Sequence, residues 1–263
     1  MYAFEYQRAK SVADAAAALA KTSGKALAGG QSLVGAMKLR LANPGTLVDL
    51  SGIAELKGIK KDGDAIVIGA LTTHAEVASS SIVKQAIPAL AALAEGIGDR
   101  QVRNRGTLGG SLANNDPAAD YPAAALGLGA TVHTNKRKIA ADDFFKGLYE
   151  TALAADEIIT AVSFPVPKKA AYVKFPQPAS RFALVGVFIA QTAGGARVAV
   201  TGAASHVHRA KAIEDALAKS FTADAAKAVK IPAARLNNDL HGSAEYRAHL
   251  VSVLAGRAVA AMH

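Results

Sequence analysis

With 263 residues, of which 51% are hydrophobic, the chain is long and apolar enough to form a large core, and this composition excludes intrinsic disorder. It contains no cysteine, which excludes disulfides, thiolate zinc sites and cysteine-held iron–sulfur clusters within the chain. The net charge of +9 would suit a nucleic-acid-binding protein, but the charges are scattered except at residues 135–138 and there is no tryptophan to stack on bases, so we expect no nucleic-acid partner.

Residues 1–52 predict a small lobe with strands at 2–6, 25–28 and 46–50, because short apolar or alternating runs are bounded there by turn residues. Ser11, with Asp14 three positions later, predicts the start of an alanine-rich helix that ends before Gly24. A short helix or turn is expected at 33–41.

Residues 53–167 predict a second lobe of hairpins and helices. Strands and hairpins are expected at 56–71, 130–140 and 157–164. Helices are expected at 73–93 with a break at Pro88, at 121–129 and at 142–145. The stretch 96–106 is a polar connection whose three arginines either face solvent or contact a ligand or partner. His74 is expected to be a surface or capping residue.

Residues 168–263 predict a third unit. Its strands are expected at 172–175, 183–192 and 197–201, and its helices at 210–219, 223–230 and 243–262. Three strands followed by three helices indicate a two-layer domain. His206 and His208 are two positions apart, but a metal site needs further ligands, so we expect no metal here.

Two glycine pairs, Gly29-Gly30 and Gly109-Gly110, stand out in this pattern. Glycine lacks a Cβ, so its backbone can approach a ligand closely, and consecutive N–H groups can hold phosphate oxygens. Two such loops could hold the two phosphates of one dinucleotide, with Asp120 placed to bind a ribose hydroxyl. The spacing fits neither the G-x-G-x-x-G nor the Walker pattern, and one Gly-Gly pair alone is more typical of an ordinary turn.

The first pair lies in Ala-Gly-Gly-x-Ser-Leu at 28–33, and the second in Thr-x-Gly-Gly-x-x-Ala-Asn-x-Asp-Pro-x-x-Asp at 107–120. Together they resemble the FAD-binding medium subunit of molybdenum hydroxylases, the family of aerobic carbon monoxide dehydrogenase and xanthine dehydrogenase. The resemblance covers nearly the whole chain and includes 38–42, 47–50, 68–73, 164–167 and 242–247.

The fold that this resemblance implies is α+β. Residues 1–52 and 53–167 would form a two-lobed flavin-binding domain of the PCMH or vanillyl-alcohol-oxidase type. Residues 168–263 would form a C-terminal α/β domain of three antiparallel strands and three helices.

The resemblance also implies noncovalent FAD and assigns residues to it. The pyrophosphate would be held by Ala28, Gly29, Gly30, Gln31 and Ser32, with Leu33 nearby, and by Thr107, Gly109, Gly110 and Ser111. Contacts with the phosphate and ribose region would come from Asn114 and Asp120, and packing near adenine or ribose from Leu153. The residues implied near the flavin ring are Ile97, Lys174 and Phe182.

Two positions depart from the family pattern. Gln31 stands where histidine is common, which removes a possible covalent anchor for FAD. Phe182 stands where carbon monoxide dehydrogenases often have tyrosine, and phenylalanine can stack but cannot hydrogen-bond.

Lys174 and backbone N–H groups near the ring would favour the anionic reduced flavin electrostatically.

The sequence offers no nucleophile–base pair and no acid–base carboxylate pair, so no catalytic residue is expected in this chain. That is typical of an electron-transfer subunit. By resemblance, a large partner subunit would carry molybdopterin, a small one would carry [2Fe–2S] clusters, and the complex would be a dimer of heterotrimers. The final acceptor (quinone, NAD⁺ or oxygen) and the substrate stay open, with a lean toward the carbon monoxide dehydrogenase branch.

Two alternatives share the fold: a stand-alone FAD-dependent reductase, such as the enzyme that reduces enolpyruvyl-UDP-N-acetylglucosamine, and a scaffold subunit that has lost FAD. No apolar run reaches the roughly 18 residues of a membrane span, and the first residues lack the apolar core of a signal peptide. We therefore expect a cytoplasmic protein with at most a peripheral membrane contact.

Overall fold

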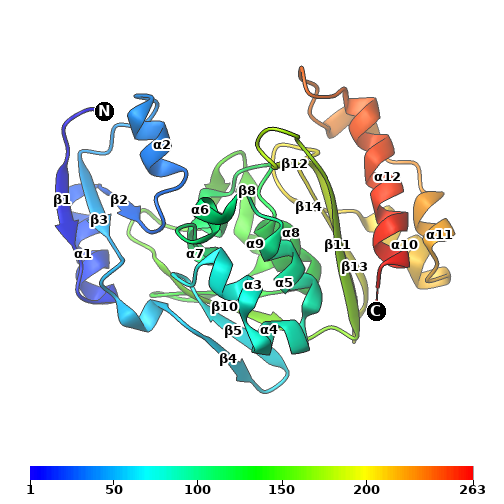
Figure 1. Cartoon of the computed structure of the whole chain (residues 1–263), viewed down its shortest axis with the longest axis horizontal. Coiled ribbons are helices and arrows are strands. Elements are labelled where there is room, and N and C mark those ends of the chain that lie inside the picture. The colour runs from blue at the N-terminus through cyan, green and yellow to red at the C-terminus, as the bar shows by residue number, and fades with distance from the viewer. Residues whose placement is uncertain (263) are drawn as a thin grey trace.

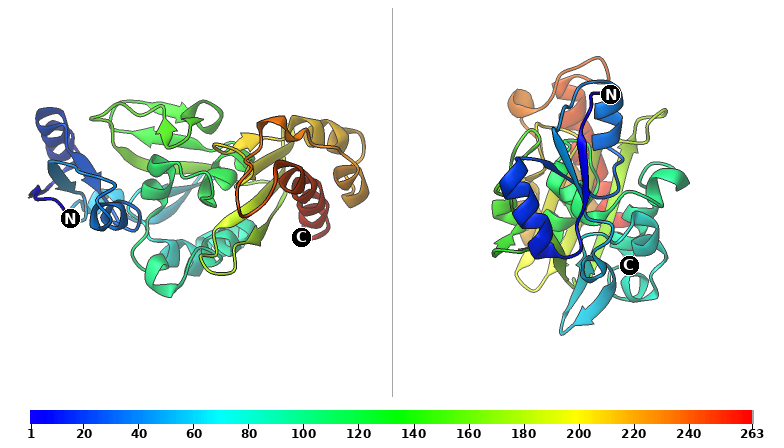
Figure 2. Two further views of the ribbon diagram at one scale, coloured as in Figure 1. Left: turned by 90° about the horizontal axis from the view of Figure 1, so that it is seen from above. Right: turned by 90° about the vertical axis from the view of Figure 1, so that its left-hand side faces the viewer.

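A computed structural model gives the fold of residues 1–262, with the N-terminal region at one end of the long axis and the C-terminal helices at the other (Figures 1 and 2). It is a mixed α+β structure, as the sequence predicts. Its buried apolar side chains form three clusters, the largest of which lies in the middle region.

The first lobe is a three-stranded parallel sheet in the order β1–β3–β2. Its strands are β1 (Glu5–Arg8), β2 (Lys25–Leu27) and β3 (Thr46–Asp49), joined through α1 (Val12–Thr22) and α2 (Leu33–Lys38). Parallel neighbours need such crossover connections. Ser11 caps α1 as predicted, accepting a hydrogen bond from the Asp14 N–H at 3.1 Å, whereas the first strand begins three residues later than expected.

The second lobe contains a five-stranded antiparallel sheet in the order β4–β5–β10–β6–β7. Its strands are β4 (Ile59–Asp62), β5 (Ala65–Gly69), β6 (Thr131–Thr134), β7 (Lys138–Ala140) and β10 (Ile159–Pro165). The connections hold the 3-10 turn η1 (Ala54–Leu56), the hairpin β8 (Phe145–Gly147) and β9 (Glu150–Thr151), and helices α3 (His74–Ser79), α4 (Ser81–Ala86), α5 (Pro88–Glu95), α6 (Arg100–Arg103), α7 (Leu108–Asn114), α8 (Tyr121–Leu128) and α9 (Ala141–Phe144).

The predicted helix break at Pro88 is confirmed, whereas two other local features of this lobe differ from the predictions. Pro88 begins α5 at its first turn, where its missing N–H costs nothing, in addition to ending the helix before it. The polar connection at 96–106 contains α6, which Asp99 caps by accepting the Val102 N–H at 2.9 Å. The small β8–β9 hairpin was not predicted, because its strands are too short for an alternating pattern.

The C-terminal region has the three predicted antiparallel strands and one more, in the order β11–β12–β13–β14. The strands are β11 (Lys169–Pro176), β12 (Ala183–Thr192), β13 (Gly195–Thr201) and β14 (His208–Arg209). The helical elements are α10 (Lys211–Lys219), α11 (Ala223–Lys227), the 3-10 turn η2 (Ala233–Arg235) and α12 (Ala244–Ala260). The fourth strand was missed because it has only two residues.

Helices cover both faces of this sheet (Figure 1). On β12, Phe188 and Ala190 join the core of the second lobe, where α5 and α8 pack against the sheet. The alternate residues Val187 and Ile189 join the cluster beneath α10 and α12. A strand covered on both faces reads as a continuous apolar run, which explains its sequence. The C-terminal sheet is therefore fixed against the second lobe.

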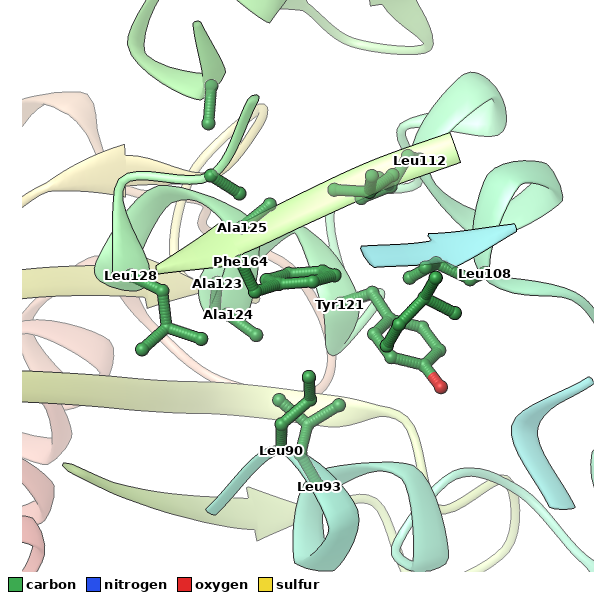
Figure 3. Close-up of a cluster of buried hydrophobic side chains, with 14 of the residues drawn as sticks. Leu90, Leu93, Leu108, Leu112, Tyr121, Ala123, Ala124, Ala125, Leu128 and Phe164 are labelled. Atoms are coloured by element: carbon green, nitrogen blue, oxygen red, sulfur yellow. The ribbon is translucent and has the colours of Figure 1, made fainter. Parts of the chain in front are cut away.

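The helix α7, which contains the second glycine pair, rests on the main core through Leu108 and Leu112 (Figure 3). Leu108 and Leu112, on either side of the pair on α7, are completely buried in the same cluster as Tyr121 and Phe164. Burying a leucine side chain contributes about 1.5–3 kcal/mol, so these two leucines fix α7 against the core of the second lobe.

An ion pair anchors the basic hairpin tip at residues 135–138. Arg137 Nε and Nη2 each lie 3.0 Å from the buried carboxylate of Glu157, which also accepts the Thr134 hydroxyl at 2.7 Å. These hydrogen bonds, above all that from Arg137, lower the pKa of Glu157 to about 2. The sequence indicates a solvated charge cluster at this tip, but one of its cations, Arg137, is paired with a buried carboxylate.

We expect Glu157→Gln to lower the free energy of unfolding at pH 7 by about 1–3 kcal/mol, because it weakens hydrogen bonds to a buried group. The folded-state pKa lies below the ordinary 4.5, so this stabilisation is present above pH 4.5 and is lost as the pH falls through about 2. Urea unfolding of both proteins at pH 7, 4 and 2 should show the difference shrink toward zero. Glu5→Gln, at an exposed strand position, is the control, and a pH-independent difference would contradict the prediction.

Candidate functional site

The first glycine loop follows β2 and needs glycine at two positions. Gly30 has φ +74°, in the left-handed region that side chains disfavour. An ideal Cβ on Gly29 would overlap the Arg105 carbonyl oxygen and lie 2.8 Å from its carbonyl carbon. The loop can therefore approach the segment before α7 only because residue 29 has no side chain.

The N–H groups of this loop differ from those of ordinary turns. Within residues 1–262, the hydrogen bonds of the chain give no acceptor to the N–H groups of Gly29, Gly30, Gln31 and Ser32. The Gln31 side chain instead donates to Gly29 O at 3.0 Å. Consecutive unpaired N–H groups are suited to bind an anion.

A hollow of about 340 Å³ opens at the same loop. It is lined by Gly29, Gly30, Gln31, Val34, Gly35, Lys38 and Arg105. Two cationic side chains and a run of free amides form a donor set that fits a diphosphate. The residues present therefore fit the phosphate part of FAD, and Lys38 and Arg105 join the site residues that the sequence predicted.

The second glycine pair lies inside the first turn of α7 and not in an open loop. Thr107 caps the helix by accepting the Gly110 N–H at 3.2 Å, and the Gly109 N–H donates to Ala70 O at 2.8 Å. Both N–H groups of the pair are therefore bonded within the chain in this structure, and a contact of the pair with a phosphate stays a prediction. Gly109 serves close packing, since its ideal Cβ would lie 2.6 Å from the Ala70 Cβ.

The two glycine motifs nevertheless meet. The ideal Cβ of Gly110 lies 3.7 Å from the Cβ of Ala28, and Gly29 packs against Arg105 and Gly106. Segments about 80 residues apart in the sequence thus form one wall, with Ser111 and Asn114 half-buried on α7 beside it. The predicted convergence of the two motifs is confirmed, although only the first offers unpaired amides.

Asp120 lies deeper than expected. It is 4% exposed, and its carboxylate accepts bonds from Lys174 Nζ at 3.0 and 3.2 Å and from the Tyr172 hydroxyl at 2.5 Å. Burial raises the pKa of Asp120, and the Lys174 charge opposes that rise. The structure thus joins two residues predicted near opposite parts of FAD, and the ribose contact of Asp120 stays a prediction.

The loop at Gly96–Gly98 is held by cations. Lys174 Nζ donates to Gly96 O at 2.9 Å, and Arg103 Nη1 donates to the carbonyls of Ile97 and Gly98 at 3.0 and 3.1 Å. The three arginines of the polar connection therefore differ in role: Arg103 is internal, Arg105 lines the hollow, and Arg100 is exposed.

The other predicted contact residues lie around this centre. Ile97 and Leu153 are half-buried and pack against the core of the second lobe. Phe182 is 48% exposed, so an aromatic face is available beyond β11. Leu33 begins α2, and Gln31 and Ser32 precede it on the exposed side of the first loop.

Two polar residues have roles that the sequence did not reveal. His74 is buried, not on the surface, with its ring 5.2 Å from that of Tyr121, and this burial lowers its pKa to about 4. Asn115, next to the predicted Asn114, has φ +43° and donates from its side chain to Gly147 O and Glu150 O, both at 2.8 Å. Both residues support the second lobe beneath the site.

Two further features of residues 1–262 bear on function. No group of three or more metal-ligating side chains is found among them. Nor does any of their helices combine the length and the apolar character needed to cross a membrane.

Comparison with known proteins agrees with this site. Residues 2–167 match the family described as "FAD binding domain in molybdopterin dehydrogenase". The chain is 37% identical to the nicotine 6-hydroxylase medium subunit of Paenarthrobacter nicotinovorans, covering 98% of this chain and 96% of that protein. It is 36% identical to the carbon monoxide dehydrogenase medium chain of Hydrogenophaga pseudoflava, covering 97% and 96%. A solved structure of the carbon monoxide dehydrogenase from that organism matches with a TM-score of 0.90 and 38% identity over 99% of this chain and 97% of that chain.

Proposed function

This chain belongs to the FAD-binding family of molybdopterin dehydrogenases, as the FAD-binding medium subunit of a molybdenum hydroxylase, and we propose that it carries electrons from a partner's [2Fe–2S] clusters to an external acceptor. It is thus an oxidoreductase subunit, and substrate oxidation takes place on the partner that holds molybdopterin. The relatives match along nearly the whole chain, including the C-terminal region, which favours a medium subunit over a stand-alone reductase of the same fold.

The observation that carries this proposal is the donor set at the first glycine loop. Four consecutive unpaired N–H groups from Gly29 to Ser32 lie beside a hollow that Lys38 and Arg105 line. The two cations would balance the charge of the FAD diphosphate, and the amides would fix its position. The chemistry that FAD supplies when bound is the uptake of two electrons and one proton and their release to an acceptor.

The proposed role of the chain's own residues is to bind FAD and to fix its orientation. The residues proposed to contact the diphosphate are Ala28, Leu33, Thr107, Gly109, Gly110, Ser111 and Asn114. Those proposed near the ribose and adenine are Asp120 and Leu153. Around the ring, the proposed residues are Ile97, Lys174 and Phe182. The proposed partners are a large molybdopterin subunit and a small [2Fe–2S] subunit in a dimer of heterotrimers. The proposed domain boundaries lie at 52/53 and 167/168, and the end of the family match at residue 167 supports the second of them.

We expect the purified chain to show a flavin absorption spectrum, or to acquire one when FAD is added, because the loop donors are preformed. Denaturation with acid should release all the flavin into the supernatant, since Gln31 offers no covalent anchor and the chain has no cysteine. A colourless protein that takes up no FAD, alone or with its co-purifying subunits, would refute the proposal. Flavin that stays with the precipitated chain would refute noncovalent binding alone.

A further inference from the structure

Two side chains meet at the buried carboxylate of Asp120. Tyr172 and Lys174 are two positions apart on β11 and so point to the same face of the sheet. The Tyr172 hydroxyl donates to Asp120 Oδ1 at 2.5 Å, and Lys174 Nζ lies 3.0 and 3.2 Å from the two carboxylate oxygens. Burial raises the pKa of Tyr172 well above its ordinary value, so the hydroxyl keeps its proton and is the donor.

The neighbouring strand is shaped around this hydroxyl. Gly186 on β12 pairs with Lys174 across the sheet, and an ideal Cβ on it would overlap the Tyr172 hydroxyl and lie 3.0 Å from Tyr172 Cζ. Glycine inside a strand is destabilising relative to alanine. Phe188, opposite Tyr172, stacks on its ring with centroids 6.2 Å apart. The position of the hydroxyl is thus fixed from three sides.

Lys174 connects this cluster to the predicted flavin contacts. Its Nζ also donates to Gly96 O at 2.9 Å, next to Ile97, and its side chain is only 12% exposed. An ammonium group held by three acceptors has little freedom to move. The electrostatic effect of this ammonium group on a neighbouring group depends on how much of its positive charge the negative charge of Asp120 cancels.

We propose that Tyr172 is a positioning residue that, through Asp120, sets the charge that Lys174 presents to the flavin and so tunes the reduction potential of bound FAD. The proposal rests on the proposed function, because it needs FAD beside Lys174. With two electrons and one proton added, the flavin ring gains one negative charge, so a nearby positive charge favours the reduced form. The electrons come from the partner's clusters in the complex and from dithionite in the test.

The direction of the effect follows from the hydrogen bond. The Tyr172 hydroxyl draws negative charge from Asp120, so removing the hydroxyl leaves Asp120 balancing Lys174 more completely. Tyr172→Phe should therefore make the reduction potential of bound FAD more negative. Asp120→Asn keeps the shape but removes the negative charge, so it should make the potential more positive.

The experiment is a spectrophotometric dithionite titration of the FAD-loaded chain against a reference dye. We expect the ratio of dissociation constants for oxidised and reduced FAD to change about tenfold in each variant, which is a shift of about 30 mV for a two-electron couple, negative for Tyr172→Phe and positive for Asp120→Asn. Tyr121→Phe is the matched control, because it also removes a buried hydroxyl near Asp120, one without a hydrogen-bond partner in the described part of the chain.

Three results would overturn the proposal. The first is a Tyr172→Phe potential equal to that of Tyr121→Phe. The second is loss of stability and FAD affinity in Tyr172→Phe with no shift, which would mean a purely structural role. The third, decisive if Tyr172→Phe does not fold, is an Asp120→Asn potential that is unchanged or more negative. Failure of the proposed function differs from all three, because the wild-type chain itself would then take up no FAD.

Discussion

Replacing Gly29 by alanine weakens FAD binding by at least about a hundredfold, which is about 2.8 kcal/mol at 1.4 kcal/mol for each factor of ten. The added Cβ would overlap the Arg105 carbonyl oxygen, a backbone atom that cannot rotate away. The first loop must therefore move off the segment that carries Arg105, and the hollow that both segments line loses its shape. Titration of the purified variant with FAD, followed by quenching of flavin fluorescence, measures the loss.

Gly45→Ala is the matched control for this substitution. Gly45 lies in the same lobe, before β3, and no atom lies within 4 Å of its ideal Cβ. We expect this variant to bind FAD as the wild type does. Binding by Gly29→Ala within threefold of the control would show that the first loop does not hold the cofactor. Equal loss in both variants would trace the effect to general damage of the lobe.

The convergence of the two glycine motifs could be predicted because each carries a local signature. Glycine pairs mark places where backbone approaches backbone or ligand, and the structure brings Gly110 against Ala28 and Gly29 against Arg105. The sequence could not show which amides stay free. The acceptor of the Gly109 N–H is Ala70, whose position depends on how β5 packs against α7.

Long periodic elements were predicted for the same reason that short ones were missed. The apolar run of β12 and the long helix α12 have enough residues to show their pattern, whereas β9 and β14 have two each. Burial of single polar residues was also beyond the sequence. His74 begins a helix, as expected, but the second lobe closes over it, and nothing in its neighbours along the chain shows this.

Roles that depend on contacts between distant residues were the least predictable. Asp120 and Lys174 were both recognised as site residues, yet their ion pair spans 54 positions and requires the C-terminal sheet to pack on the second lobe. Tyr172 has no motif of its own. Its only indication in the sequence is Gly186, inside an otherwise apolar strand. That Gly186 makes room for the Tyr172 hydroxyl can be inferred only when the strand register is known.

Arg247→Met lowers the stability of the chain by about 3 kcal/mol, because it leaves two buried carbonyls without this donor, each at a usual cost of about 1–3 kcal/mol. Arg247 is 3% exposed. Its Nη1 donates to Leu184 O and Gly202 O at 2.9 Å, and its Nη2 donates to both oxygens of Asp239 at 2.8 Å. Methionine keeps the apolar stem but leaves the two buried carbonyls without this donor, whereas the exposed Asp239 carboxylate still accepts the His241 N–H at 2.9 Å.

Thermal unfolding followed by circular dichroism tests this expectation. A loss of that size should lower the melting temperature by about 10 °C, at roughly 2–4 °C for each kcal/mol in a chain of this size. Arg257→Met is the matched control, since Arg257 lies exposed on the same helix, and a surface substitution of this kind stays within about 0.5 kcal/mol. Equal melting temperatures for the two variants would mean that the turn around Asp239 and the end of β13 hold together without the arginine. In that case the Ser-Ala-Glu-Tyr-Arg motif at 243–247 would need an explanation outside the stability of this domain.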